Sequence, residues 1–181
     1  MQAAKRVLRY LKGSMSFGIF YKKGRCEELV AYTDSDYARD LDDRRSTSGY
    51  VFLLSGGAVS WASKKQPVVS LSTSEAEFIA AAYCACQCVW TRRILEQFGV
   101  LKSGSSTILC DNDSTIKLSK NPVLHGRSKR FHFLRDLIRE GVLELNYCDT
   151  KAQLADIMTK PLNLETFVRL REELGVCEDI N

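Results

Sequence analysis

The order of predicted elements indicates an α/β protein built around a mixed sheet. Three β-rich runs come first, and helical segments then alternate with two further strands. The 181 residues are 45% hydrophobic and 27% charged, which is typical of a soluble globular protein with one main domain. A pure doubly wound fold would alternate strand and helix throughout. We therefore expect a five-stranded sheet, three strands antiparallel and two parallel, flanked by helices.

Two short elements precede the main body. Val7, Leu8 and Leu11 recur at helical spacing within residues 2–12. Residues 18–21, GIFY, predict a short strand before a Lys-Lys-Gly turn. We expect both to be the end of a larger upstream unit.

Three strands open the main body. The first is the β-rich run at 29–33. The second and third, at 49–54 and 58–62, flank a Ser-Gly-Gly turn, so residues 48–63 predict a hairpin.

Helices and strands alternate in the second half. Ser72 and Glu75 form a capping-box pattern that begins a long helix, which Gly99 ends. The other expected elements are a strand at 107–110, helices at 113–120 and 131–139, a strand at 142–147, and helices at 152–159 and 164–174.

Composition limits the chemistry and the location. Two histidines, His125 and His132, are too few for a centre built on several imidazoles, so catalysis has to depend on carboxylates. Seven cysteines, an odd number without a CxxC pair, predict reduced thiols in an intracellular protein that is not secreted. No apolar run approaches the ~18 residues of a membrane span, so no membrane partner is expected. The net charge of +4 permits a polyanionic partner.

Acidic residues stand at the ends of predicted elements. Asp34 follows the first strand of the main body, and Asp111 follows the fourth. These two acids converge if their strands are parallel neighbours. In open α/β sheets, ligand crevices lie at such strand ends. Glu77 lies in the first turn of the long helix, and Asp156 lies in a late helix. Four converging acids would suit hard divalent cations.

Each acid also has a structural interpretation. Asp34 and Asp111 could be ordinary strand-end turn residues, and Asp156 could complement a helix dipole. Glu75 and Glu77 both have apolar neighbours four residues on, so spacing alone does not separate them, although Glu75 is most simply a capping residue.

Four motifs carry a resemblance to a known family. They read YTDSDYARDLDDRRSTSGYVF (32–52), SWASKKQPVVSLSTSEAEFIAA (60–81), LCDNDSTIKLSKNP (109–122) and QLADIMTKPL (153–162). In this order they resemble the ribonuclease H domain of copia-type retrotransposon Pol polyproteins. The resemblance implies a ribonuclease H-like domain over 25–162. It also implies an upstream reverse transcriptase or connection remnant at 1–24, and a C-terminal helix and tail at 163–181.

The resemblance assigns catalytic and metal-binding roles to four residues. The family's T-D motif matches Asp34, its A-E motif matches Glu77 rather than Glu75, its acid after the fourth strand matches Asp111, and its L-A-D motif matches Asp156. The implied cofactor is Mg²⁺, as two ions, with Mn²⁺ as an alternative. Asp34 would bridge both ions, Glu77 and Asp111 would hold the ion on the leaving-group side, and Asp156 would hold the water-activating ion.

The implied reaction is hydrolysis of the RNA strand of an RNA–DNA hybrid, leaving 5′-phosphate and 3′-hydroxyl ends. The implied partners are the hybrid and the reverse transcriptase domain of the same polyprotein. The implied location is a cytoplasmic virus-like particle or the nucleus. The candidate contacts to nucleic acid are Lys64, Lys65, Gln66, Asn112, Ser114, Arg127, Lys129 and Arg130. For Lys64 and Lys65, the alternative interpretation is that they are ordinary solvated surface lysines.

Two departures from the family pattern keep other functions open. The loop at 148–154 has no histidine, which leaves the proton relay unassigned. About four residues, roughly one helical turn, are missing before Phe131. The alternative is an inactive remnant that keeps the fold and at most weak binding to nucleic acid or the polymerase domain. A generic divalent-dependent nuclease or integrase-like domain would not explain the SKKQ and LADIMTKPL motifs together.

Overall fold

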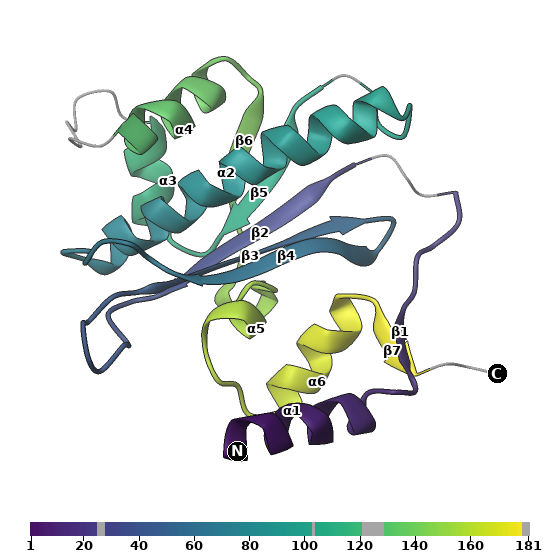
Figure 1. Ribbon diagram of the computed structural model, residues 1–181. Helices are drawn as coiled ribbons and strands as arrows, with labels where there is room; N and C mark the ends of the chain where they lie inside the picture. Colours follow the sequence, from purple (N-terminus) through teal and green to yellow (C-terminus); the bar gives the residue numbers. More distant parts are fainter. Residues whose placement is uncertain (25–27, 103, 121–128, 179–181) are drawn as a thin grey trace.

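A five-stranded mixed sheet forms the centre of the molecule (Figure 1). The computed structural model describes residues 1–24, 28–102, 104–120 and 129–178, without the side chains of 129–131. The sheet has the order β4-β3-β2-β5-β6, in which β2, β3 and β4 pair antiparallel and β2, β5 and β6 pair parallel. This confirms the predicted fold class. The strands are β2 (Val30–Asp36), β3 (Thr47–Leu54), β4 (Gly57–Lys65), β5 (Ser106–Cys110) and β6 (Leu143–Tyr147).

The predicted hairpin joins β3 to β4. Ser55 and Gly56 form its two-residue turn with φ angles of 54° and 79°. Two positive φ values give the twist that matches paired strands, and glycine adopts such values at little cost. Val51 and Phe52 in β3 are both fully buried, and they belong to core clusters on opposite faces of the sheet. Both faces of the sheet are therefore covered.

Three helices cover one face: α2 (Thr73–Gln97), α3 (Asp113–Lys120) and α4 (Lys129–Arg139). The capping box confirms the predicted start of α2, because Ser72 Oγ accepts a hydrogen bond from Glu75 N at 3.1 Å. Alanines at 81, 82 and 85 are buried and let this helix lie close to the sheet. The larger core cluster fills this layer.

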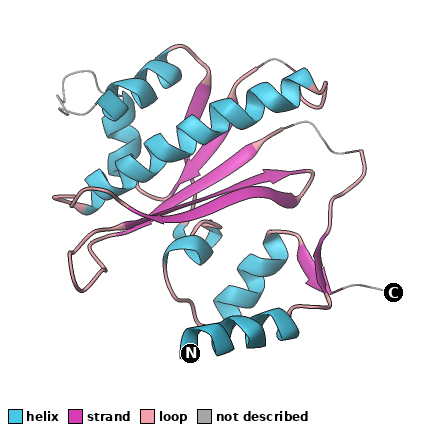
Figure 2. Cartoon of the chain, viewed as in Figure 1, coloured by secondary structure: helices cyan, strands magenta, loops and turns pink. Residues whose placement is uncertain are grey.

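The opposite face carries α5 (Asp156–Thr159) and α6 (Leu164–Glu173). Beyond α6 lie α1 (Gln2–Gly13) and a separate two-stranded sheet (Figure 2). This small sheet pairs β1 (Phe17–Ile19) antiparallel with β7 (Val176–Glu178), so segments near the two ends of the chain meet. The strand at 176–178 was not predicted. The domain boundaries at 24 and 162 stay predictions. Within the described ranges, no helix has the length and apolar character needed to cross a membrane.

The helix predicted over residues 152–159 is wrong in its first half. A 3₁₀ turn (Thr150–Ala152) is followed by a break, and α5 begins only at Asp156. Gln153 causes the break because its side chain is used as a backbone substitute. Its Nε2 donates to Thr33 O at 2.9 Å, and its Oε1 accepts from Ala155 N at 3.1 Å.

Candidate active site

Neighbouring parallel strands bring Asp34 and Asp111 to the same level of the sheet. Tyr32 in β2 is paired with Leu109 in β5, so the residues two positions farther along each chain are Asp34 and Asp111. Asp34 lies inside β2 rather than after its end, because β3 continues to pair with β2 as far as Asp36. The two acids converge as predicted, and β2 extends beyond the strand predicted at 29–33.

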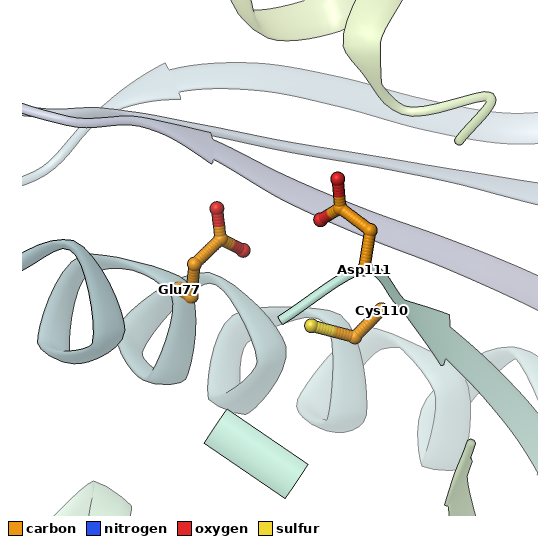
Figure 3. A group of neighbouring side chains, drawn as sticks. All are labelled: Glu77, Cys110 and Asp111. Atoms are coloured by element: carbon orange, nitrogen blue, oxygen red, sulfur yellow. The ribbon is translucent and has the colours of Figure 1, made fainter. Parts of the chain in front are cut away.

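Glu77 reaches the same place from the first turns of α2. Its Oε1 accepts a hydrogen bond from Ser35 N at 3.1 Å. Its Oε2 is buried and has no hydrogen-bond partner among the described residues. Figure 3 shows the Glu77 carboxylate facing Asp111, with the Cys110 thiol beside them. One ligand atom from each of these three residues lies within 4.8 Å of the others.

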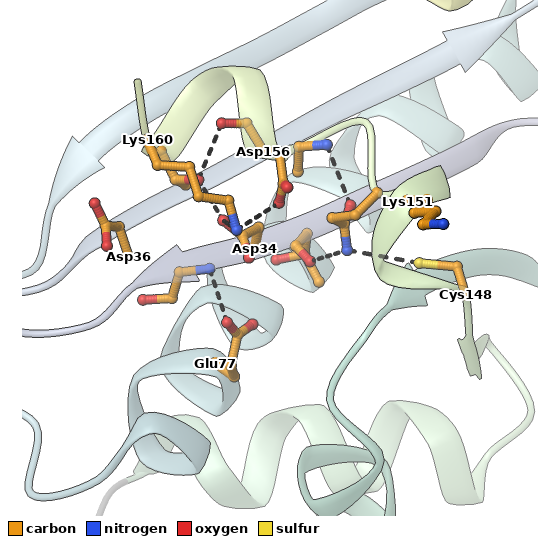
Figure 4. Close-up of polar contacts among 12 residues, drawn as sticks. Asp34, Asp36, Glu77, Cys148, Lys151, Asp156 and Lys160 are labelled. Atoms are coloured by element: carbon orange, nitrogen blue, oxygen red, sulfur yellow. Dashed lines mark hydrogen bonds and ion pairs between the residues drawn. The ribbon is translucent and has the colours of Figure 1, made fainter. Parts of the chain in front are cut away.

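The fourth acid, Asp156, approaches from α5 on the other face of the sheet (Figure 4). Two residues of the same short segment accompany it. Thr159 Oγ1 donates a hydrogen bond to Asp34 Oδ2. Lys160 Nζ lies 2.9 Å from Asp156 Oδ1 and 3.8 Å from Asp34 Oδ2. The structure thus brings together all four acids that the sequence predicts.

Burial and mutual repulsion raise the pKa values of Asp34, Glu77 and Asp156. Asp34 is 2% exposed, and Glu77 and Asp156 are each 7% exposed. Removal from water, and then the charges of Asp34 and Asp111, raise the pKa of Glu77 to about 9. Removal from water also raises the pKa of Asp156 to about 6, against the lowering effect of Lys160. Burial raises the pKa of Asp34 too.

These groups fit a divalent cation with oxygen ligands. The acids are held close together without enough positive charge, and the buried Glu77 Oε2 lacks a partner in the described structure. A hard cation such as Mg²⁺ or Mn²⁺ would supply that charge and take carboxylate oxygens as ligands. Burial raises the pKa of the Cys110 thiol, so the thiol stays protonated at neutral pH and leaves the carboxylates as ligands.

The candidate nucleic-acid contacts at the end of β4 and directly after it lie in three different environments. Lys64 is exposed. Lys65 Nζ is paired with Asp40 Oδ2 at 2.7 Å and with Asp43 Oδ2 at 2.9 Å. Gln66 is 1% exposed, and its amide bonds inside the protein, so a contact with a phosphate would require that these bonds break.

The other candidate contacts lie beyond β5 and at α4. Asn112 Oδ1 accepts a hydrogen bond from Thr115 N at 2.9 Å, and Ser114 is exposed in the first turn of α3. Arg127 lies outside the described residues, and the suspected deletion near Lys129 and Arg130 stays a prediction. Lys129 and Arg130 are the first residues of α4, and their side chains are not described. Their roles stay predictions.

Thr159 and Lys160 are site residues that the sequence patterns did not single out. Both lie in the LADIMTKPL motif, three and four residues after Asp156. Residues at this spacing share one face of a helix, which is the signal that could have identified them.

The fold and the four acids define a ribonuclease H-like domain with a carboxylate centre. The chain superposes on LC11-RNase H1, solved in complex with an RNA/DNA hybrid, with a TM-score of 0.51 and 15% identity, covering 73% of this chain and 94% of that one. It superposes on the N-terminal RNase H domain of a Mycobacterium tuberculosis protein with a TM-score of 0.55 and 10% identity, covering 81% and 97%. At these identities the likeness establishes the fold.

Sequence relatives identify the chain more closely. It is 40% identical to the retrovirus-related Pol polyprotein from transposon RE1 of Arabidopsis thaliana and 38% identical to that from transposon TNT 1-94 of Nicotiana tabacum. Each match covers 97% of this chain but only 12% and 13% of the relative. No family model matches the chain. The chain is homologous to a segment of retrovirus-related Pol polyproteins from transposons, which confirms the resemblance predicted from its motifs.

Proposed function

We propose that the chain is a divalent-metal-dependent ribonuclease H that hydrolyses the RNA strand of RNA–DNA hybrids. The observation that carries the proposal is the convergence of Asp34, Glu77, Asp111 and Asp156 from three secondary-structure layers. A fold of this kind needs no buried acids at the centre of its sheet, because buried carboxylates without compensating cations destabilise a protein. Their presence therefore supports a functional site.

The four acids would hold two Mg²⁺ ions, or Mn²⁺ in their place. Bound ions of this kind polarise the phosphate and stabilise the attacking and leaving oxygens of a phosphodiester. The residues around the acids keep the ligands in place. Ser35 N holds one oxygen of Glu77, and the Thr159 hydroxyl holds one oxygen of Asp34. Such fixed hydrogen bonds orient ligands before the ions bind.

The polyprotein context supports the proposed partners. The relatives are named as Pol polyproteins, and one structural neighbour is the foamy viral protease-reverse transcriptase in complex with an RNA/DNA hybrid, with a TM-score of 0.52 and 16% identity. We infer that the chain acts beside the reverse transcriptase domain of a copia-type element, inside the cell. Its +4 charge is a weak attraction for a hybrid, so the polymerase domain would supply much of the binding.

Cleavage of a labelled RNA–DNA hybrid tests the proposal. With Mg²⁺ or Mn²⁺ the unmodified protein is expected to cut the RNA strand and to leave RNA–RNA and DNA–DNA duplexes intact. Asp34→Asn is expected to reduce the rate by about 100-fold or more, because it removes a ligand charge from the centre of the site.

Asp36→Asn is the matched control. Asp36 lies in the same strand but pairs with Arg39 at 3.2 Å, away from the four acids, so its variant should keep the cleavage rate (Figure 4). Cleavage that persists in Asp34→Asn would contradict the site. A folded protein that binds Mn²⁺ without cutting the hybrid would instead support the inactive-remnant alternative.

A further inference from the structure

Lys160 places a positive charge between two of the four acids. Its Nζ lies 2.9 Å from Asp156 Oδ1 and 3.8 Å from Asp34 Oδ2 (Figure 4). Both carboxylates are almost completely buried. A buried carboxylate requires a cation or hydrogen-bond donors close by, so this ammonium group stabilises the ionised forms of Asp34 and Asp156.

Lys160 alone does not supply enough positive charge to balance the four acids. Among the side chains that the structure describes, Lys160 is the basic group in ion-pair contact with these acids, and Glu77 and Asp111 take part in no ion pair there. One ammonium group therefore faces four acids. It also donates at most three hydrogen bonds, whereas a divalent ion takes six or more oxygen ligands.

The position of Lys160 allows its side chain to leave. The backbone is fixed, because Lys160 N donates to Asp156 O at 3.1 Å at the end of α5. The side chain is 31% exposed, so its path to solvent is open. A lysine carries its charge on a flexible four-carbon stem, which can move the ammonium group while the main chain stays in place.

We propose that Lys160 is a tethered cation that occupies the ion position between Asp34 and Asp156 and that the first divalent ion has to displace. The inference rests on the proposed function, since it takes these two acids as metal ligands. Lys160 is thereby a positioning residue. It keeps the two carboxylates together before an ion binds, and it lowers the affinity of the site for that ion.

The test measures Mn²⁺ binding directly, by the loss of the electron paramagnetic resonance signal of free Mn²⁺ in the absence of nucleic acid. Lys160→Met keeps much of the stem and removes the charge. It is expected to bind the first ion about 10-fold more tightly than the unmodified protein, which corresponds to about 1.4 kcal/mol. Its melting temperature in chelator should fall, and Mn²⁺ should raise it by more than in the unmodified protein.

Lys117→Met is the matched control. Lys117 pairs with Asp113 at the same four-residue spacing, on the exposed side of α3 and outside the site, so Mn²⁺ affinity should not change. Lys160→Gln provides a second neutral variant if Lys160→Met does not fold. Unchanged or weaker Mn²⁺ binding in the folded neutral variants would overturn the inference. Because binding is measured without substrate, tighter binding combined with no cleavage of a hybrid would count against the proposed ribonuclease and not against this role of Lys160.

Discussion

Individual buried polar side chains connect separate elements of the fold through hydrogen bonds. Gln66 is the clearest case, because its Nε2 lies 2.8 Å from Ser48 Oγ and 2.9 Å from Ala76 O. Its Oε1 accepts a hydrogen bond from Ser70 Oγ at 2.8 Å. One amide thus joins β3, the loop before α2 and α2 itself, close to the helix turn that carries Glu77. Substituting it would leave several buried groups without partners.

We expect Gln66→Ala to lower the free energy of unfolding by about 2 kcal/mol, because buried donors and acceptors lose their hydrogen bonds. Urea denaturation measures this change. Gln97→Ala, at an exposed glutamine at the end of α2, should change stability by less than about 0.5 kcal/mol. Equal stability of the two variants would disprove the connecting role. A lower hybrid affinity of Gln66→Ala at unchanged stability would support the nucleic-acid contact predicted from sequence.

At the scale of elements, the short helix α5 has to lie directly on β3. Gly49 makes this possible. A Cβ atom at this position would lie 2.6 Å from Thr159 Cγ2, 2.8 Å from Met158 Cβ and 3.3 Å from Ala155 O. Gly49 is also the partner of Asp34 in the β2–β3 register. The close approach therefore brings the residues of α5 within reach of Asp34.

Gly49→Ala is expected to push α5 away from the sheet. Overpacking of this kind costs about 1–3 kcal/mol of stability. Mn²⁺ affinity should fall in the same variant, because Asp156 would move away from Asp34. Gly13→Ala serves as a control, since a Cβ atom there meets nothing within 4 Å. If Gly49→Ala bound Mn²⁺ as tightly as the unmodified protein, the close approach would not be what positions Asp156.

For the whole molecule, the buried acids make stability depend on pH. Burial, followed by the charges of Asp34 and Asp111, raises the pKa of Glu77 from 4.5 to about 9. Burial raises the pKa of Asp156 from 3.8 to about 6. These two carboxyl groups therefore bind protons more tightly in the folded protein than in the unfolded chain. The stability that they contribute is fully present below their unfolded pKa values and is lost as pH rises through their folded pKa values.

In chelator, the free energy of unfolding is expected to fall continuously between about pH 5 and pH 8. Staying below the ordinary thiol pKa of about 8.5 keeps the buried cysteines out of the measurement. Glu77→Gln should flatten the profile, because the amide does not titrate. Mn²⁺ should stabilise the protein more at the upper end of this range, where the ligands are ionised. A profile that rises with pH in chelator would contradict the raised pKa values.

Local patterns were sufficient for much of the fold. The strands of the hairpin, the capping box of α2 and the helix end at Gly99 depend on residues within a few positions of one another, and all three are present. The pattern was insufficient at residues 152–155, where Gln153 bonds to Thr33 O across 120 positions of sequence and interrupts the expected helix.

The sequence by itself predicted the fold class, because the alternation and caps of its elements are local properties of the chain, and it predicted the four acids through motifs that resemble a known family. Only the tertiary structure decided what surrounds those acids. Thr159 and Lys160 contact Asp34 across at least 125 positions of sequence, and β1 meets β7 from the opposite end of the chain. Such contacts depend on how layers pack, and no periodicity along the chain encodes the distance between side chains on different layers.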